Sequence, residues 1–357
     1  MRVYNFAAGP STLPLNVLEQ AQAEFLDFGG TGMSVCEISH RDKTYMAIVE
    51  EAESLVRELL NVPEDYAVIF VQGGASTQFA AIPLNLMHSG VADYIVTGNF
   101  AKKAWQEGQI YGTANKIGDS SDKTYTYIPD VDKLNYTEGA DYVHITSNNT
   151  IFGSRYSKFP TCKAPLVADM SSEIFSREVD VSKFGVIYAG AQKNLAPAGV
   201  TIVIAKRSLI QDPLKICPTM LKWKVQDENG SLYNTPPAFA IYMACLVLRN
   251  LKAKGGVKAM QEVNEYKAKL LYDFIDGSDL YKNNVVPQFR SIMNVPFVTG
   301  SEELDAKFVS EAKKAGLVSL KGHRLVGGMR ASIYNAMPVE GVKALIEFMK
   351  KFETENK

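Results

Sequence analysis

Cysteine is scarce in this chain of 357 residues, and its four cysteines lie far apart in the sequence. Cys36, Cys162, Cys217 and Cys245 include no CxxC pair, which is the spacing typical of zinc and redox sites. We therefore expect reduced thiols in a cytoplasmic protein, and no metal site.

The chain also lacks long apolar runs and an excess of charge of either sign. No run reaches the roughly 18 residues that span a bilayer. The N-terminal segment MRVYNFAAGPSTLP, broken by Gly9 and two prolines, lacks the apolar core of a signal peptide. Lys and Arg number 38 against 39 Asp and Glu, for a formal charge of −1. Neither a membrane nor nucleic acid is therefore expected as a partner.

Apolar runs of strand length alternate with segments of helical spacing, which predicts an α/β fold. Strands are predicted near 66–71, 93–97, 142–147, 165–168, 185–190 and 199–204. Helices are predicted near 15–28, 42–60, 238–248 and 256–275. The rest of the chain predicts a strand at 294–299, a helix at 302–315, a strand at 329–334 and a helix at 339–352.

The length predicts two domains, because single hydrophobic cores stop growing at roughly 250–300 residues. We place a large domain at 16–255 and a small domain at 256–357. The N-terminal segment 1–15 is expected to dock beside the small domain.

The most informative stretch carries an acid and an amine at the ends of two neighbouring predicted strands. Asp169 follows the run PLVA, and Lys193 follows the run GVIYAG. Carboxyl ends of such strands border the crevice where α/β sheets bind ligands. This pair suits pyridoxal 5′-phosphate (PLP), with the lysine forming a Schiff base and the aspartate pairing with the pyridinium nitrogen.

Taken alone, the pair leaves a plainer interpretation open. Strands often end on aspartate, and lysine is common on exposed turns. The neighbours of Lys193 favour the cofactor, since they are small or turn-forming and let a flat ring approach the backbone. They are Gly190, Ala191, Asn194, Ala196, Pro197, Ala198 and Gly199.

Three motifs, VADMSS, AGAQKN and GGMRASIYNA, resemble those of the phosphoserine aminotransferases, a family of class V, fold-type I PLP enzymes. The resemblance runs from NFAAGP at Asn5 to the C-terminal helix. It implies a large domain with a mostly parallel, seven-stranded-type sheet and a smaller α+β domain. It also implies a homodimer whose active sites are shared across the interface.

The resemblance further implies transfer of an amino group from L-glutamate to 3-phosphohydroxypyruvate, giving O-phospho-L-serine and 2-oxoglutarate. The kinetics would be ping-pong, through pyridoxamine phosphate. Whether the vitamin B6 precursor 4-phosphohydroxy-L-threonine is also accepted stays open.

The catalytic residues implied are Lys193 and Asp169. Asp169 would keep the ring nitrogen protonated, and Lys193 would carry the proton between Cα and C4′. An amine does this only when partly deprotonated, which desolvation and the neighbouring pyridinium favour.

A strand followed by Gly73-Gly74 and a helix predicts a phosphate site, because backbone N–H groups at a helix start bind anions. Such turns are common, and this one is not GxGxxG, which argues against a dinucleotide. By resemblance, Ala75 and Ser76 contact the cofactor phosphate, and Ser76 departs from a common arginine.

Other cofactor contacts follow from the resemblance alone. Phe100 stands where the family usually has a ring-stacking tryptophan, and the alternatives are a packed core phenylalanine or a role for Trp105. Thr150 would contact the cofactor, beside an Asn149 that replaces a commoner acid. Gln192 would contact the phosphate. Asn234 and Thr235, which otherwise suggest a simple turn, would reach the phosphate of the neighbouring subunit's cofactor.

Five cationic residues are candidates for substrate binding. His40 and Arg41 precede a predicted helix, where cations are disfavoured unless they bind something. His323, Arg324 and Arg330 lie in a glycine-rich segment, and arginine forks suit carboxylate and phosphate. Solvated surface charge is the plainer alternative. By resemblance, Arg330 binds the α-carboxylate and the other four bind the distal anion, with His40 and Arg41 coming from the partner.

Two other functions stay open at this point. A cysteine desulfurase needs a reactive cysteine on a mobile loop, and no cysteine stands in an obvious loop of that kind. A non-catalytic module that binds sugar phosphates would leave Lys193 and Asp169 unexplained.

Overall fold

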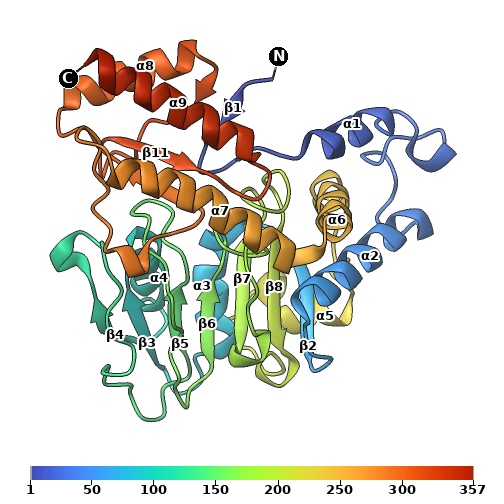
Figure 1. The fold of residues 1–357 in the computed structure, drawn as a ribbon. Coiled ribbons are helices and arrows are strands. Elements are labelled where there is room, and N and C mark those ends of the chain that lie inside the picture. The colour runs from blue at the N-terminus through green and yellow to red at the C-terminus, as the bar shows by residue number, and fades with distance from the viewer. Residues whose placement is uncertain (1, 357) are drawn as a thin grey trace.

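The computed structural model describes residues 2–356, and its centre is a twisted sheet of seven strands (Figure 1). In spatial order the strands are β2 (Tyr66–Val71), β8 (Thr201–Lys206), β7 (Val186–Gly190), β6 (Leu166–Asp169), β5 (Val143–Thr146), β3 (Val91–Val96) and β4 (Thr113–Asp119). The pairs β3·β4, β3·β5, β5·β6 and β6·β7 are parallel, while β8 is antiparallel to both neighbours. The predicted α/β fold class is confirmed.

Helices cover both faces of this sheet, and the side chains of β7 show how. Val186 and Tyr188 pack in one buried cluster with α3 and α4 residues. Ile187 and Ala189 point the other way and pack with residues of α2 and α6. Because helices cover both faces of the sheet, its strands are apolar on both sides, which explains the continuous apolar runs in the sequence. The helices up to residue 255 are α1 (Leu15–Ala23), α2 (Lys43–Leu60), α3 (Gly74–Leu86), α4 (Asn99–Gly108), α5 (Trp223–Glu228) and α6 (Ala238–Ala253).

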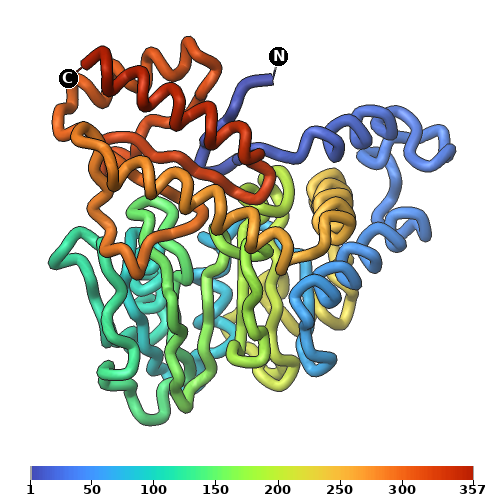
Figure 2. Tube along the Cα trace, viewed as in Figure 1, coloured from blue at the N-terminus to red at the C-terminus, as the bar shows by residue number. Residues whose placement is uncertain are grey.

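The C-terminal elements pack around a separate buried cluster. They are α7 (Gly256–Asp276), β9 (Asn294–Phe297), α8 (Glu302–Lys314), β10 (Leu317–Val318), β11 (Met329–Ser332) and α9 (Val339–Glu355). Strands β9 and β11 pair antiparallel, and β10 pairs in parallel with β1 (Tyr4–Asn5). Figure 2 shows the blue N-terminal stretch passing beside the red C-terminal layer before α1 projects away.

The predicted helix at 15–28 is wrong over residues 24–28. Helix α1 ends at Ala23, and Phe25 and Leu26 are 45% and 81% exposed. Aromatic packing onto α6 accounts for the break. The Phe25 ring lies 5.9 Å from Phe239, and the Phe28 ring lies 5.5 Å from Tyr242. Within residues 2–356, no helix combines the length and apolarity that crossing a membrane requires.

A buried lysine joins α7 to the segment after β11. The Lys267 Nζ donates hydrogen bonds to the carbonyls of Ile333 (3.0 Å), Tyr334 (2.8 Å) and Met337 (3.0 Å). Burial lowers the pKa of this amine to about 7. The segment it holds contains Asn335, which contacts the turn of Lys193.

Replacing Lys267 with methionine is expected to lower the free energy of unfolding by about 2–4 kcal/mol, since buried carbonyls lose their donor. The matched control is Lys269→Met on the same helix. Lys269 makes an exposed ion pair with Asp273 at 2.6 Å, and its loss should cost less than about 1 kcal/mol. Urea unfolding at pH 7 compares the two, and equal effects would contradict a structural role for Lys267.

Candidate active site

Asp169 and Lys193 meet at the carboxyl edge of the parallel strands. Asp169 is the last residue of β6, and Lys193 lies in the turn between β7 and β8. The two side chains are buried, with 4% and 8% of their residues' surfaces exposed. The Asp169 Oδ1 accepts a hydrogen bond from the Ser171 backbone N–H at 2.9 Å.

The electrostatics of the two groups are coupled. Burial raises the pKa of Asp169, and the opposing effects are the charge of Lys193 and the hydrogen bonds from Ser171. Burial lowers the pKa of Lys193 to about 8, Asp169 opposes this shift and Arg330 adds to it. An appreciable fraction of the Lys193 amine is therefore unprotonated near neutral pH, as a nucleophile or a general base requires.

Three further predicted residues surround the Lys193 amine. The Nζ donates to Thr150 Oγ1 at 2.7 Å. The Arg330 Nη1 donates to the Thr150 carbonyl at 3.2 Å, while the buried Arg330 Nε has no hydrogen-bond partner. The Phe100 ring centroid lies 5.5 Å from Lys193 Nζ. Lys193, Asp169, Thr150, Phe100 and Arg330 therefore form one group, which we call the lysine group.

The N-terminal segment packs directly on the turn of Lys193. The Ser11 N–H donates to the Gln192 carbonyl at 3.0 Å, and the Ser11 hydroxyl donates to the Lys193 carbonyl. Gly9 has a φ of +132°, and a Cβ there would lie 3.2 Å from Lys193 Cγ. Sequence reasoning missed these contacts, although the motif NFAAGP contains Gly9.

The start of α3 has the geometry of an anion site. Gly73 and Gly74 have φ values of +94° and +66°, and a Cβ on Gly73 would lie 1.9 Å from Thr77 Oγ1. Only glycine fits there. The N–H groups of the first turn lack intrahelical acceptors, and Ala75 and Ser76 stand in that turn. Ala75 packs against the same buried cluster as Phe100.

A second group of predicted residues lies apart from the lysine group. His40 Nδ1 and Thr235 Oγ1 are 3.3 Å apart, and the buried His40 Nε2 has no partner. Arg41 is exposed beside His40. Asn234 lines a cavity of about 240 Å³ together with Gly73. Between the lysine group and these residues, the described part of the chain shows no hydrogen bond or ion pair.

The remaining predicted cations are His323 and Arg324, and His323 lies close enough to Arg324 and Arg330 for their charges to act on it. The pKa of His323 is lowered first by burial and then by the charges of Arg330, Arg324 and Lys103. The His323 Nδ1 accepts the Leu325 N–H at 3.2 Å, so the imidazole folds onto its own glycine-rich loop. Lys103 was not predicted from the sequence, because only the fold brings α4 to this loop.

The residues present suit PLP. A buried acid and a buried amine attract each other, an aromatic ring lies beside the amine, and a helix start offers free N–H groups. The buried Arg330 Nε has no hydrogen-bond partner and could donate to a bound anion. Gln192 is half-buried, and its Oε1 lies against Gly190, where a Cβ would be 2.6 Å away.

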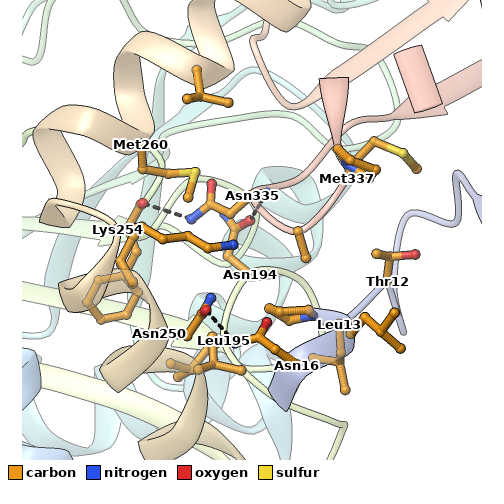
Figure 3. Close-up of a pocket in the computed structure, with 18 of the residues that line it drawn as sticks. Thr12, Leu13, Asn16, Asn194, Leu195, Asn250, Lys254, Met260, Asn335 and Met337 are labelled. Carbon is orange, nitrogen blue, oxygen red and sulfur yellow. Dashed lines mark hydrogen bonds between the residues drawn. The ribbon is translucent and has the colours of Figure 1, made fainter. Parts of the chain in front are cut away.

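A cavity of about 670 Å³ lies behind the turn of Lys193, between the N-terminal segment, α6, α7 and the segment after β11. None of the predicted site residues lines it. Figure 3 shows Asn194 and Asn335 side by side in its wall. The Asn335 N–H donates to Asn194 Oδ1 at 3.0 Å, which ties the Lys193 turn to the chain just beyond Arg330.

Three of the four cysteines do not suit the reactive thiol of a desulfurase. Cys217 and Cys245 are buried, Cys162 is half-buried and Cys36 is exposed. Burial raises the pKa of Cys162 to about 11 and that of Cys245 to about 12. Such thiols stay protonated and unreactive at neutral pH. Across residues 2–356, His, Cys, Asp and Glu form no group of three or more that could hold a metal ion.

Comparison with known proteins places the whole chain. A family model described as aminotransferase class-V matches residues 3–345. The chain is 56% identical over 358 residues to a phosphoserine aminotransferase of Bacillus cereus, covering 100% of this chain and 99% of that protein.

Two solved structures agree with this placement. Phosphoserine aminotransferase from Bacillus circulans subsp. alkalophilus superposes with a TM-score of 0.98 at 47% identity, covering 100% of this chain and 99% of that one. The PLP-bound phosphoserine aminotransferase from Trichomonas vaginalis gives a TM-score of 0.94 at 41% identity, with 98% and 100% covered. The chain belongs to the class-V aminotransferases and, among them, to the phosphoserine aminotransferase family.

Proposed function

We propose that this protein transfers the amino group of L-glutamate to 3-phosphohydroxypyruvate, giving O-phospho-L-serine and 2-oxoglutarate. The reaction is a step of serine biosynthesis, and the cofactor is PLP. The observation that carries the proposal is the buried pair of Lys193 and Asp169, with the cations of Arg330, His323 and Arg324 nearby. When bound, PLP supplies an electron sink for the pair of electrons left at the substrate Cα.

Residues of the chain hold the cofactor, move the proton and orient the reacting groups. Lys193 would hold the cofactor until the substrate amine displaces it. Its freed Nζ, whose lowered pKa permits this role, would then take the proton from the substrate Cα and deliver it to C4′. Thr150 Oγ1, 2.7 Å from Nζ, orients the amine. The Asp169 carboxylate keeps a proton on the ring nitrogen, and the Ser171 N–H fixes its position at 2.9 Å.

Each substrate carries an α-carboxylate at one end and a distal anion at the other, and separate cationic residues bind the two. Arg330 pairs with the α-carboxylate, and its unpartnered Nε is free to do so. His323 and Arg324 bind the distal anion, which is a phosphate in one substrate and a carboxylate in the other. One cationic site thus serves both half-reactions. We assign Ala75, Ser76 and Gln192 to the cofactor phosphate and Phe100 to the face of the ring.

We further propose a homodimer with shared active sites. His40 and Arg41 of the partner subunit complete the distal anion site, and Asn234 and Thr235 of the partner subunit reach the cofactor phosphate. The contact between His40 and Thr235 supports this, because residues that one subunit contributes to its partner's active site should lie close to each other. The exposed apolar residues Phe25 and Leu26 lie after α1, in the segment that leads to His40, and support an interface there.

Two coarser features complete the proposal. The separate buried clusters support a large domain at 16–255 and a small domain at 256–357, with 1–15 beside the small domain. Four free cysteines support a cytoplasmic location.

The half-reactions test the function directly. The protein reconstituted with PLP is mixed separately with phosphoserine, glutamate and alanine, and the visible absorbance is followed. Phosphoserine and glutamate should each change the spectrum, while alanine, which lacks a distal anion, should not. Formation of 2-oxoglutarate from glutamate and 3-phosphohydroxypyruvate should follow. An equal response to alanine would refute the assigned substrates.

A further inference from the structure

Lys103 lies on the face of α4 that carries Phe100. The two residues are three positions apart, which places them on the same side of a helix. The Lys103 Nζ lies 5.9 Å from the Phe100 ring centroid, and Lys193 Nζ lies 5.5 Å from the same centroid. The Lys103 ammonium therefore lies beside the same ring as the Lys193 amine.

The same ammonium faces the small-domain loop. Its charge acts on His323, together with the charges of Arg324 and Arg330. Lys103 comes from the large-domain helix α4, whereas the other three come from the segment 323–330. An anion between them would touch both domains.

This cluster of cations has no internal counter-charge. Over residues 2–356 no carboxylate forms an ion pair with Lys103, His323, Arg324 or Arg330. Glu107 stands four residues after Lys103 on the same helix face, but no ion pair joins the two, and the Glu107 carboxylate accepts a hydrogen bond from Tyr111 at 3.5 Å. Uncompensated charge of one sign in a cleft concentrates ligands of the opposite sign.

We propose that Lys103 is a specificity-determining residue that favours the phosphate substrate over the dicarboxylate. The inference rests on the proposed function. A phosphate monoester carries close to two negative charges at neutral pH, and the side-chain carboxylate of glutamate carries one. A point charge such as lysine interacts with the total charge and not with donor geometry. Lys103 therefore stabilises bound phosphoserine about twice as strongly as bound glutamate.

The test is Lys103→Met, with Lys102→Met as the matched control. Lys102 is also exposed, and it points about 100° away around the helix. We expect kcat/KM in the half-reaction to fall about threefold for glutamate and about tenfold for phosphoserine, because doubling the interaction free energy squares the fold-change. The change should appear in KM and leave kcat unaltered.

Further measurements separate binding from a structural role. Lys103→Arg should restore the preference for phosphoserine, and raising the salt concentration should shrink the difference between wild type and Lys103→Met. Binding of inorganic phosphate to the PLP-loaded protein, measured by calorimetry, should weaken in Lys103→Met and not in Lys102→Met.

The outcomes are distinguishable. If the wild type responds to neither phosphoserine nor glutamate, the proposed function fails. If the wild type is active but Lys103→Met changes both substrates equally, or matches Lys102→Met, the assignment of Lys103 is overturned.

Discussion

Replacing Lys193 with alanine is expected to lower amino transfer at least about 10⁴-fold, because one amine serves as nucleophile and as general base, and the base alone contributes about 10²–10⁴-fold. Burial lowers the pKa of this lysine to about 8, so the amine acts without a separate base. The rate of 2-oxoglutarate formation from glutamate and 3-phosphohydroxypyruvate measures the loss.

Two companion variants define what the loss means. Lys193→Arg keeps a positive charge opposite Asp169, but a guanidinium stays protonated and accepts no proton, so it should be equally inactive. Lys183→Ala removes a mostly exposed lysine in the turn before β7 and should keep full activity. Thermal unfolding should show all three folded. Turnover by Lys193→Ala within tenfold of wild type would remove the basis of the mechanism.

Much of the fold follows from local pattern. The run YAVIFV predicts a strand over 66–71, and β2 has the same bounds. Asp42 is the first residue of the predicted helix at 42–60, and its side chain caps α2 by accepting the Thr44 N–H at 2.8 Å. The local sequence pattern does not show which strands pair with each other in the sheet. The antiparallel direction of β8 is set by the turn holding Lys193 and by its pairing with β2, a strand about 130 residues earlier in the chain.

The same limit applies to the site. Asp169 and Lys193 are visible in the sequence because strand ends border the ligand crevice. Thr150 is implied only by family resemblance. Arg330 is a candidate from its glycine-rich segment, but nothing in the sequence pairs it with Thr150, which it contacts at 3.2 Å. Ser11 and Lys103 are missed altogether. Their positions depend on the contact of the N-terminal segment with the Lys193 turn and on the approach of Lys103 to Phe100 and to His323, which no local periodicity encodes.

Asp169→Asn is expected to lower turnover about 10³-fold, the range seen when one preorganised electrostatic group is removed from an active site. The amide has the shape of the carboxylate and still accepts the Ser171 N–H. It cannot, however, hold a positive charge on the ring nitrogen. The loss should appear in kcat, while binding of phosphoserine through Arg330 and the other cations stays close to that of wild type.

A second readout follows from the coupling between the acid and the amine. The charge of Asp169 raises the pKa of Lys193 against the effect of burial, so its removal should move that pKa below about 8. In cofactor-free protein, the rate of lysine modification at residue 193 should then level off at a lower pH in Asp169→Asn than in wild type. Asp180→Asn is the control, since this exposed acid caps a short turn through Ser182 and pairs with the exposed Lys183 at 3.9 Å. An unchanged profile in Asp169→Asn would mean that the two buried groups do not act on each other, and the pairing of acid and amine across one aromatic ring would lose its physical support.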